Sequence, residues 1–304
     1  MFLAYINDLP DVVSGCRVKI FADDTKLYKE IGSQEDCEIL QLAIDEVFDW
    51  SVTWQLRFHP DKCQILRLGR SAPSFTYSMG DYAGGDRHNL DVSPCQKDLG
   101  VLVDNELAFR DHISCIVAKA NGVLGVIRRT FRFLDSSSLL LLYKSMVRPI
   151  IEYGIPAWSP FLWKDIDEIE AIQRRATKMV PGLREVPYPE RLRRLDLPCL
   201  RYRRLRGDMI YMYKYLTGDM AGNATLFQRA VVSSTRGHPL KIHKPCCIKS
   251  IRQRSFTQRS IDVWNSLPTH VVMAPSLNGF KSSFDKAWKQ SKLYFDYKAD
   301  ISAN

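Results

Sequence analysis

The chain has 304 residues, of which 45% are hydrophobic and 25% charged, and this composition indicates a globular protein and excludes an intrinsically disordered one. The length allows two domains of ~100–200 residues each. The net charge of +9, from 43 basic and 34 acidic residues, fits a polyanionic partner such as nucleic acid. A solubilising basic surface would give the same total, so the charge alone decides little.

The cysteines and the apolar runs limit the cellular compartments in which the protein is expected. Eight cysteines are scattered along the chain, and none forms a Cys-x-x-Cys pair. Because no secretory leader is recognisable, we expect reduced thiols and an intracellular protein, in the nucleus or the cytoplasm and not secreted. No run approaches the ~20 apolar residues of a membrane span, so no membrane partner is expected.

The first stretch leads to a pair of acidic residues. Residues 2–9 are hydrophobic and are interpreted as the end of a buried helix, closed by Pro10. Two short β-prone runs follow, with Asp23 and Asp24 between them, and this pattern predicts a hairpin that carries both carboxylates. A divalent cation relieves the repulsion between them, and hard oxygen ligands suit Mg²⁺. An ordinary Asp-Asp turn is the alternative.

A long helix and several short strands are expected next. Ser33-x-x-Asp36 is an N-capping pattern that opens an amphipathic helix ending near Gln55, with Trp50 and Trp54 in the core. Short elements complete this half of the chain: a turn at 59–63, a strand at 64–68, loops over 70–95 with a strand at 74–79, and a turn at 96–100 before a buried strand.

From about residue 108 the hydrophobic periodicity becomes helical. The fold class is therefore α+β. Helices are expected at about 108–131, 136–146, 165–180, 187–195, 199–216, 256–264 and from Ser276, with breaks at Pro149, Pro156 and Pro160. Residues 218–250 are linker-like, and residues 251–304 form a small helical C-terminal unit.

The motifs together resemble one family. Phe21-Ala22-Asp23-Asp24 resembles the Phe/Tyr-x-Asp-Asp hairpin of reverse transcriptases, in the form used by non-LTR (LINE-type, jockey-like) retrotransposons. Further matches lie at Phe2–Pro10, His59–Cys63, Lys97–Val101, Leu142–Pro149, Ile172–Ala176, Val263–Pro268 and Ser276–Lys281. His59 stands where this family usually has Asn.

The resemblance implies an RNA-directed DNA polymerase. It implies a partial palm over residues 1–107, a helical thumb over 108–217, and two-metal nucleotidyl transfer with metals about 3.5–4 Å apart. Asp23 and Asp24 would be catalytic residues that bind Mg²⁺. The third carboxylate, the fingers and a Gly-Pro-Gln turn would precede Met1, so we expect a C-terminal fragment that is inactive alone.

Further residues receive roles from the same resemblance. Lys62 would be a general acid or a contact to the leaving pyrophosphate; an exposed turn lysine is the alternative. Lys97 and Gly100 would hold the primer end. Contacts to the phosphates of an RNA template and DNA primer are expected from Arg174, Arg175, Lys178, Arg201, Arg203 and Arg204. A solvated helix face is the alternative for these cations.

A zinc knuckle is weighed and set aside. His238, His243, Cys246 and Cys247 are the nearest candidates, but adjacent cysteines do not fit the usual Cys-x₂₋₄-Cys spacing. A loop rich in Pro and Lys is the preferred interpretation. Two alternatives to a polymerase remain open: a non-catalytic nucleic-acid-binding remnant, and a helical interaction protein whose Asp-Asp hairpin has no catalytic role.

Overall fold

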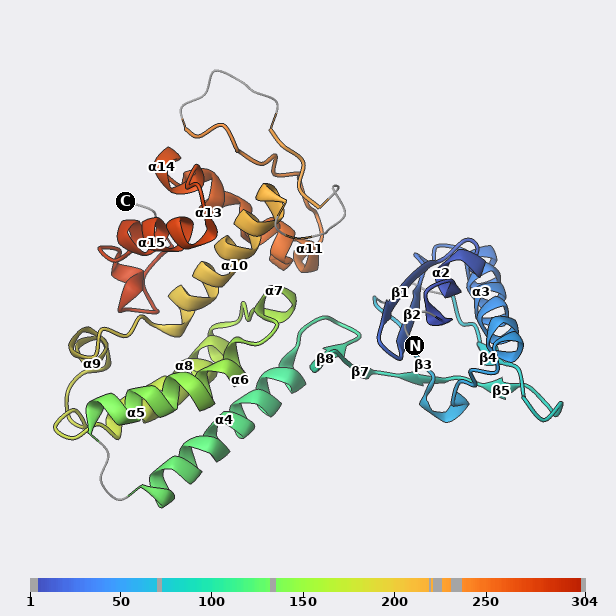
Figure 1. The fold of residues 1–304 in the computed structure, drawn as a ribbon, viewed down its shortest axis with the longest axis horizontal. Helices are drawn as coiled ribbons and strands as arrows, with labels where there is room; N and C mark the ends of the chain where they lie inside the picture. Colours follow the sequence, from blue (N-terminus) through green and yellow to red (C-terminus); the bar gives the residue numbers. More distant parts are fainter. Residues whose placement is uncertain are drawn as a thin grey trace. The chain divides into compact units, whose positions relative to one another are not determined.

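The computed structural model describes residues 5–69, 73–131, 135–218, 220, 226–230 and 237–301. The fold is α+β, as the sequence predicted, and it divides into two compact units at residues 1–108 and 109–304 (Figure 1). Within the described ranges, the named strands all belong to the first unit. No helix in these ranges is both long and apolar enough to cross a membrane.

A β-hairpin carries the acidic pair. Strands β1 (Arg17–Phe21) and β2 (Asp24–Tyr28) are antiparallel, with Phe21 opposite Asp24, so only Ala22 and Asp23 connect them. Side chains alternate along both strands, and one face packs toward the cluster formed with the helices of this unit. The predicted hairpin is confirmed.

Helix α3 (Gln34–Thr53) supports this hairpin. It begins with a complete capping box, in which Ser33 accepts from the Asp36 amide and the Asp36 side chain accepts from the Ser33 amide. The predicted cap is therefore confirmed. The helix ends two residues earlier than expected, and Trp54 is its C-cap. Trp50 is buried, but Trp54 is 44% exposed, so the prediction that Trp54 lies in the core was wrong.

A short helix precedes the hairpin. Pro10 lies in the first turn of α2 (Leu9–Val12), so the prediction that it closes the segment was wrong. Proline is tolerated at this position because the first amides of a helix have no intrahelical acceptor. Leu9 is fully buried and packs with Val47 and Trp50 of α3. Residues 2–4 of the expected helix lie outside the described ranges.

The other strands of the first unit form short pairs. β3 (Gln64–Leu66) is parallel to β6 (Asp91–Ser93), and β4 (Ser78–Met79) is antiparallel to β5 (His88–Asn89). The strands expected at 64–68 and 74–79 are thus shorter than predicted.

The expected turn at 96–100 belongs to a second hairpin. β7 (Cys95–Asp98) and β8 (Val101–Asp104) are antiparallel and joined by Leu99 and Gly100. Both loop residues have positive φ, at 44° and 88°, and a glycine accepts this conformation without a Cβ penalty. Gly100 therefore has a structural role in the turn.

The described part of the second unit is mainly helical. Its first helices are α4 (Arg110–Thr130), α5 (Ser136–Leu142), α6 (Arg148–Glu152), α7 (Ile155–Trp158), α8 (Trp163–Lys178), α9 (Tyr188–Arg194) and α10 (Leu200–Thr217). After residues 226–249, which include a bridge between Arg229 and Ile242, come α11 (Ser250–Arg254), α12 (Phe256–Arg259), α13 (Ile261–Ser266), α14 (Thr269–Val272) and α15 (Leu277–Trp288).

The expected break at Pro149 is absent. Instead, the helical segment continues from α5 through a π-helical turn, Tyr143–Val147, into α6, which contains this proline. Proline has no amide hydrogen, and its ring clashes with the carbonyl four residues earlier. A π-turn directly before it widens the backbone, which accounts for the continuation to Glu152.

The core of the second unit lies between α10 and the C-terminal helices. Phe280, Phe284 and Trp288 of α15 are buried, and Tyr213 of α10 stacks on Phe280 at 4.5 Å. Ser276 caps α15, as predicted, by accepting from the Gly279 amide.

The expected linker-like segment contributes to the same core. Within residues 218–250, Phe227 and Ile242 are 6% and 2% exposed and pack in this cluster. The expected ranges 108–217, 218–250 and 251–304 fall almost wholly in this second unit.

Candidate functional site

The tip of the β1–β2 hairpin presents two carboxylates to solvent. Asp23 lies in the two-residue loop and Asp24 is the first residue of β2, and both are exposed. Neither side chain makes a hydrogen bond or an ion pair with the described part of the chain. Both carboxylates are therefore available to a cation.

The backbone at this tip is strained. Ala22 has φ of 54°, in the left-handed region where an L-residue costs roughly 1–2 kcal/mol. Two-residue hairpin loops favour positive φ at their first position because their twist then matches that of the strands. The tight connection between Phe21 and Asp24 imposes this conformation on an alanine.

An ion pair joins the acidic hairpin to the second hairpin. Lys26 of β2 contacts Asp98 of β7, and both side chains are partly exposed. This pair places the β7–β8 hairpin, which contains Lys97 and Gly100, beside the acidic one. The two partners are 72 residues apart in the sequence, and no local pattern signalled the pairing.

Lys62 lies in a separate turn. It ends the 3₁₀ turn Pro60–Lys62, its side chain is exposed, and its amide donates to the His59 carbonyl at 2.9 Å. Within the described residues, its ammonium group has no hydrogen bond or ion pair with Asp23 or Asp24.

No metal cluster is formed by the residues that the structure describes. Nowhere in these ranges do three or more His, Cys, Asp or Glu side chains converge as potential metal ligands. Among the zinc candidates, His238 is buried with its Nε2 2.9 Å from the Trp264 carbonyl, whereas His243 and Cys246 are exposed. The structure does not bring these side chains together with Cys247 as a zinc site.

The three basic candidates on α8 differ in their surroundings. Arg174 is half-buried, donates to the Asp167 carbonyl at 3.2 Å and lies over the ring of Tyr297. Arg175 is exposed and donates to Asn121 of α4 at 2.6 Å, and Lys178 is exposed as well.

The arginines of α10 are held within the fold. Arg201 donates to the carbonyls of Tyr297 and Ala299 at 2.9 and 2.8 Å. Arg203 forms a two-pronged ion pair with Glu152 of α6. These bonds fix both guanidinium groups in place within the second unit.

Arg204 is only 4% exposed, in the same region as Glu170, which is also buried. Burial raises the pKa of the Glu170 carboxyl, although a hydrogen bond from Tyr188 and the charge of Arg204 oppose the rise. Glu170 also accepts from the Leu200 amide at the first turn of α10, where a negative charge complements the helix dipole. Arg204 is therefore a buried cation that interacts with the charge of Glu170, and its two Nη atoms have no hydrogen-bond partner among the described residues.

Comparison with known proteins decides the relationship. The chain is 24% identical over 192 residues to an RNA-directed DNA polymerase from the mobile element jockey of Drosophila funebris. It is 23% identical over 196 residues to a probable RNA-directed DNA polymerase from the transposon X-element of Drosophila melanogaster. The chain is related to the reverse transcriptases of non-LTR retrotransposons.

The similarity covers part of each protein. Each alignment includes 60% of this chain, and the chain spans about a fifth of the length of these relatives, 19% and 20% respectively. No family model and no solved structure matches the chain.

The candidate residues of this reverse-transcriptase relative divide into two sets by exposure. The exposed set comprises Asp23, Asp24, Lys62, Lys97, Gly100, Arg175 and Lys178. The second set, Arg174, Arg201, Arg203 and Arg204, is partly or fully buried and bonded or packed within the second unit. Sequence spacing did not distinguish these sets because arginine occurs both on solvated helix faces and in internal ion pairs.

Proposed function

We propose that this chain is part of an RNA-directed DNA polymerase of a non-LTR retrotransposon, with the β1–β2 hairpin as its metal-binding element. The observation that carries the proposal is the placement of Asp23 and Asp24 at a strained hairpin tip, side by side, exposed and without partners among the described residues. The relationship to the jockey and X-element polymerases supports it.

The donor set of the hairpin fits Mg²⁺. Carboxylate oxygens are hard ligands, and two of them on adjacent residues give a local charge that a divalent cation neutralises. Asp23 is proposed as the principal ligand and Asp24 as a second ligand or an electrostatic partner. When bound, the metal would supply activation of the primer 3′-hydroxyl and neutralisation of phosphate charge.

A two-metal site needs more carboxylates than this hairpin provides. Within the described residues, no third acidic side chain converges on Asp23 and Asp24 as a metal ligand. We propose that the missing carboxylate comes from outside the described ranges or from another polypeptide, and that this chain does not polymerise by itself.

The surroundings of the hairpin suggest how nucleic acid would lie. The Lys26–Asp98 ion pair holds the β7–β8 hairpin near the acidic tip, where the exposed Lys97 is available to the primer backbone. Lys62 is proposed as a contact to the leaving pyrophosphate.

On the second unit, exposed Arg175 and Lys178 are proposed to contact template–primer phosphates. They are three residues apart on α8 and therefore share a helix face. The arginines of α10 are assigned a structural role instead, because their donors or their burial commit them to the fold.

Filter binding to an RNA–DNA primer–template across a salt series tests the nucleic-acid part of the proposal. We expect salt-dependent affinity, and the double variant Arg175→Ala/Lys178→Ala should lower the slope of log affinity against log salt by about 2, or about 1 per lost phosphate contact. Lys286→Ala, an exposed lysine on α15, is the matched control and should leave the slope unchanged.

The two parts of the proposal can fail separately. No affinity at low salt would contradict nucleic-acid binding and favour a helical interaction protein. Primer extension with Mg²⁺, compared between the unaltered chain and Asp23→Asn, tests the chemistry. Incorporation that depends on Asp23 would establish the catalytic role and overturn the expectation that the chain is inactive alone.

A further inference from the structure

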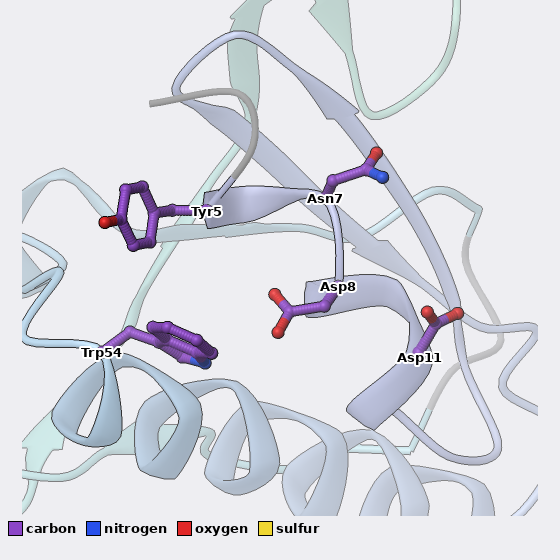
Figure 2. A pocket seen from close by; sticks show the side chains of 5 residues that line it. All are labelled: Tyr5, Asn7, Asp8, Asp11 and Trp54. Atoms are coloured by element: carbon purple, nitrogen blue, oxygen red, sulfur yellow. The ribbon is translucent and has the colours of Figure 1, made fainter. Parts of the chain in front are cut away.

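A second feature of the first unit is a pocket whose lining does not include Asp23 or Asp24. Tyr5, Asn7, Asp8, Asp11 and Trp54 line a pocket of about 340 Å³ (Figure 2). Tyr5 and Trp54 are 47% and 44% exposed, so the pocket opens to solvent.

Two aromatic rings form one side of the pocket. The rings of Tyr5 and Trp54 meet edge to face, with centroids 5.9 Å apart and an interplanar angle of 71°. This leaves an aromatic surface that is accessible from the pocket. The negative face of a tryptophan or tyrosine ring attracts a cation placed over it.

Two carboxylates form the other side. Asp8 points toward the space between the rings, while Asp11 lies farther along α2 (Figure 2). Asp8 is held in place because its Oδ1 accepts from the indole Nε1 of the buried Trp50 at 3.1 Å. Asp11 has no side-chain partner among the residues that the structure describes. The position of Asp8, but not that of Asp11, is thus fixed by an internal hydrogen bond.

The combination selects the chemical class of the ligand. An anion would be repelled by both carboxylates, and an apolar group would desolvate them without compensation. A strongly hydrated metal ion such as Mg²⁺ would contact the carboxylates but would leave the two aromatic rings without a ligand. An organic cation can pack against the aromatic rings and pair with the carboxylates at the same time.

Among organic cations, a guanidinium fits best. Its plane stacks on aromatic faces, and its N–H donors bond carboxylates in parallel, whereas an ammonium group acts as a point charge. We propose that this pocket binds the arginine side chain of a partner polypeptide. The proposal is independent of the polymerase assignment, because the pocket contains none of the residues assigned to nucleotidyl transfer.

Titration with a blocked tripeptide, acetyl-Gly-Arg-Gly-amide, tests this proposal. The readout is the indole N–H signal of Trp54 in an NMR spectrum, assigned by its loss in Trp54→Leu. The same tripeptide with citrulline is the neutral isostere. We expect saturable shifts with the arginine peptide, affinity on the order of millimolar for so few contacts, and weaker binding at high salt.

Variants separate the pocket from general charge. Asp11→Asn should lower the affinity for the arginine peptide by about two- to fivefold. Trp54→Leu, in which binding is followed through other NMR signals, should lower this affinity by about threefold. Asp8→Asn retains an acceptor for Trp50 and should weaken binding as well. Asp49→Asn on α3, an exposed acid outside the pocket, is the matched control and should change nothing.

Three results would overturn the proposal. Equal shifts with the citrulline peptide would show that the positive charge does not contribute to binding. Unchanged affinity in both Asp11→Asn and Trp54→Leu would place binding elsewhere. Tighter binding of the corresponding lysine peptide would contradict the choice of a guanidinium. Asp11→Asn alters a solvent-exposed side chain and keeps the test independent of any folding defect in the other variants.

Discussion

At the scale of single residues, the backbone conformation of the loop that carries Asp23 depends on the neighbouring Ala22. The sequence predicted the hairpin from two adjacent acids between β-prone runs. It could not predict the positive φ, because glycine or asparagine is the usual signal of that conformation. The close pairing of Phe21 with Asp24 imposes the left-handed backbone on an alanine.

Substitution of Ala22 tests this strain. Ala22→Gly should raise the free energy of unfolding by up to ~1 kcal/mol, because removal of the Cβ relieves a clash while greater chain entropy offsets part of the gain. Ala22→Val should lower it, since a β-branched residue is least tolerated at positive φ. Urea unfolding followed by circular dichroism measures both. A stabilising valine would contradict the assigned conformation.

Trp54 shows a second limit of prediction at this scale. Its spacing from Trp50 places both on the same helical face, and the sequence therefore predicted that both lie in the core. The helix ends at Thr53, and the ring of Trp54 consequently remains 44% exposed. Because the exact end of a helix is decided by local hydrogen bonds, hydrophobic periodicity alone could not locate it.

At the scale of elements, α3 was predicted well because its signals are local. The capping pattern and the apolar spacing lie within twenty residues of each other. Hydrogen bonds from the Gly32 amide and the Ser33 hydroxyl lower the pKa of the Asp36 carboxyl to about 2. Asp36 thus remains ionised in the folded chain at pH values where it would be protonated in the unfolded one.

The capping box gives a pH-dependent prediction. The folded-state pKa of Asp36 lies below its ordinary value of 3.8, so its contribution is complete above that pH and is lost as the pH falls toward about 2. The stability difference between the unaltered chain and Asp36→Asn should therefore shrink over this range. Ser33→Ala should cost ~1 kcal/mol at neutral pH. Unfolding curves at several pH values measure both, and a pH-independent difference for Asp36→Asn would contradict the cap.

The roles of the arginines in helix α10 could not be predicted in the same way, because their partners are distant in the sequence. Arg206 donates through two nitrogens to Asp285 of α15, at 2.6 and 2.8 Å, and Tyr202 donates to the same carboxylate. The run of arginines could be read from the sequence. The acids paired with Arg203 and Arg206 lie 51 and 79 residues away, so the choice between internal pairs and phosphate contacts required the fold.

Removal of the Arg206–Asp285 pair tests the structural role of α10. Arg206→Ala should lower the free energy of unfolding by ~1.5–3 kcal/mol, as expected for hydrogen bonds to a charged group. Arg206→Lys should recover only part of the loss, because lysine cannot form the two parallel bonds. Arg128→Ala, an exposed arginine on α4, is the control and should change stability by less than ~0.5 kcal/mol. Equal effects of Arg206→Ala and Arg128→Ala would refute the assignment.

At the scale of the whole molecule, the α+β class followed from the change of periodicity near residue 108. The chain divides into compact units beside that position. Long-range pairings could not be predicted from the sequence. The Lys26–Asp98 contact between two hairpins and the packing of Phe227 into the C-terminal core have no local pattern. The proposed site therefore depends on contacts that only the fold reveals.

The central claim is that Asp23 and Asp24 bind a divalent metal. Fe²⁺ substituted for Mg²⁺ reduces added hydrogen peroxide to hydroxide and a hydroxyl radical, which cleaves the backbone next to the metal, and mass spectrometry locates the cuts. We predict cleavage within residues 20–26 that Mg²⁺ suppresses and that disappears in Asp23→Asn. Asp86→Asn, an exposed acid in a loop of the same unit, should leave the cuts unchanged. Absence of cleavage at the hairpin, or an identical pattern in Asp23→Asn, would contradict the claim.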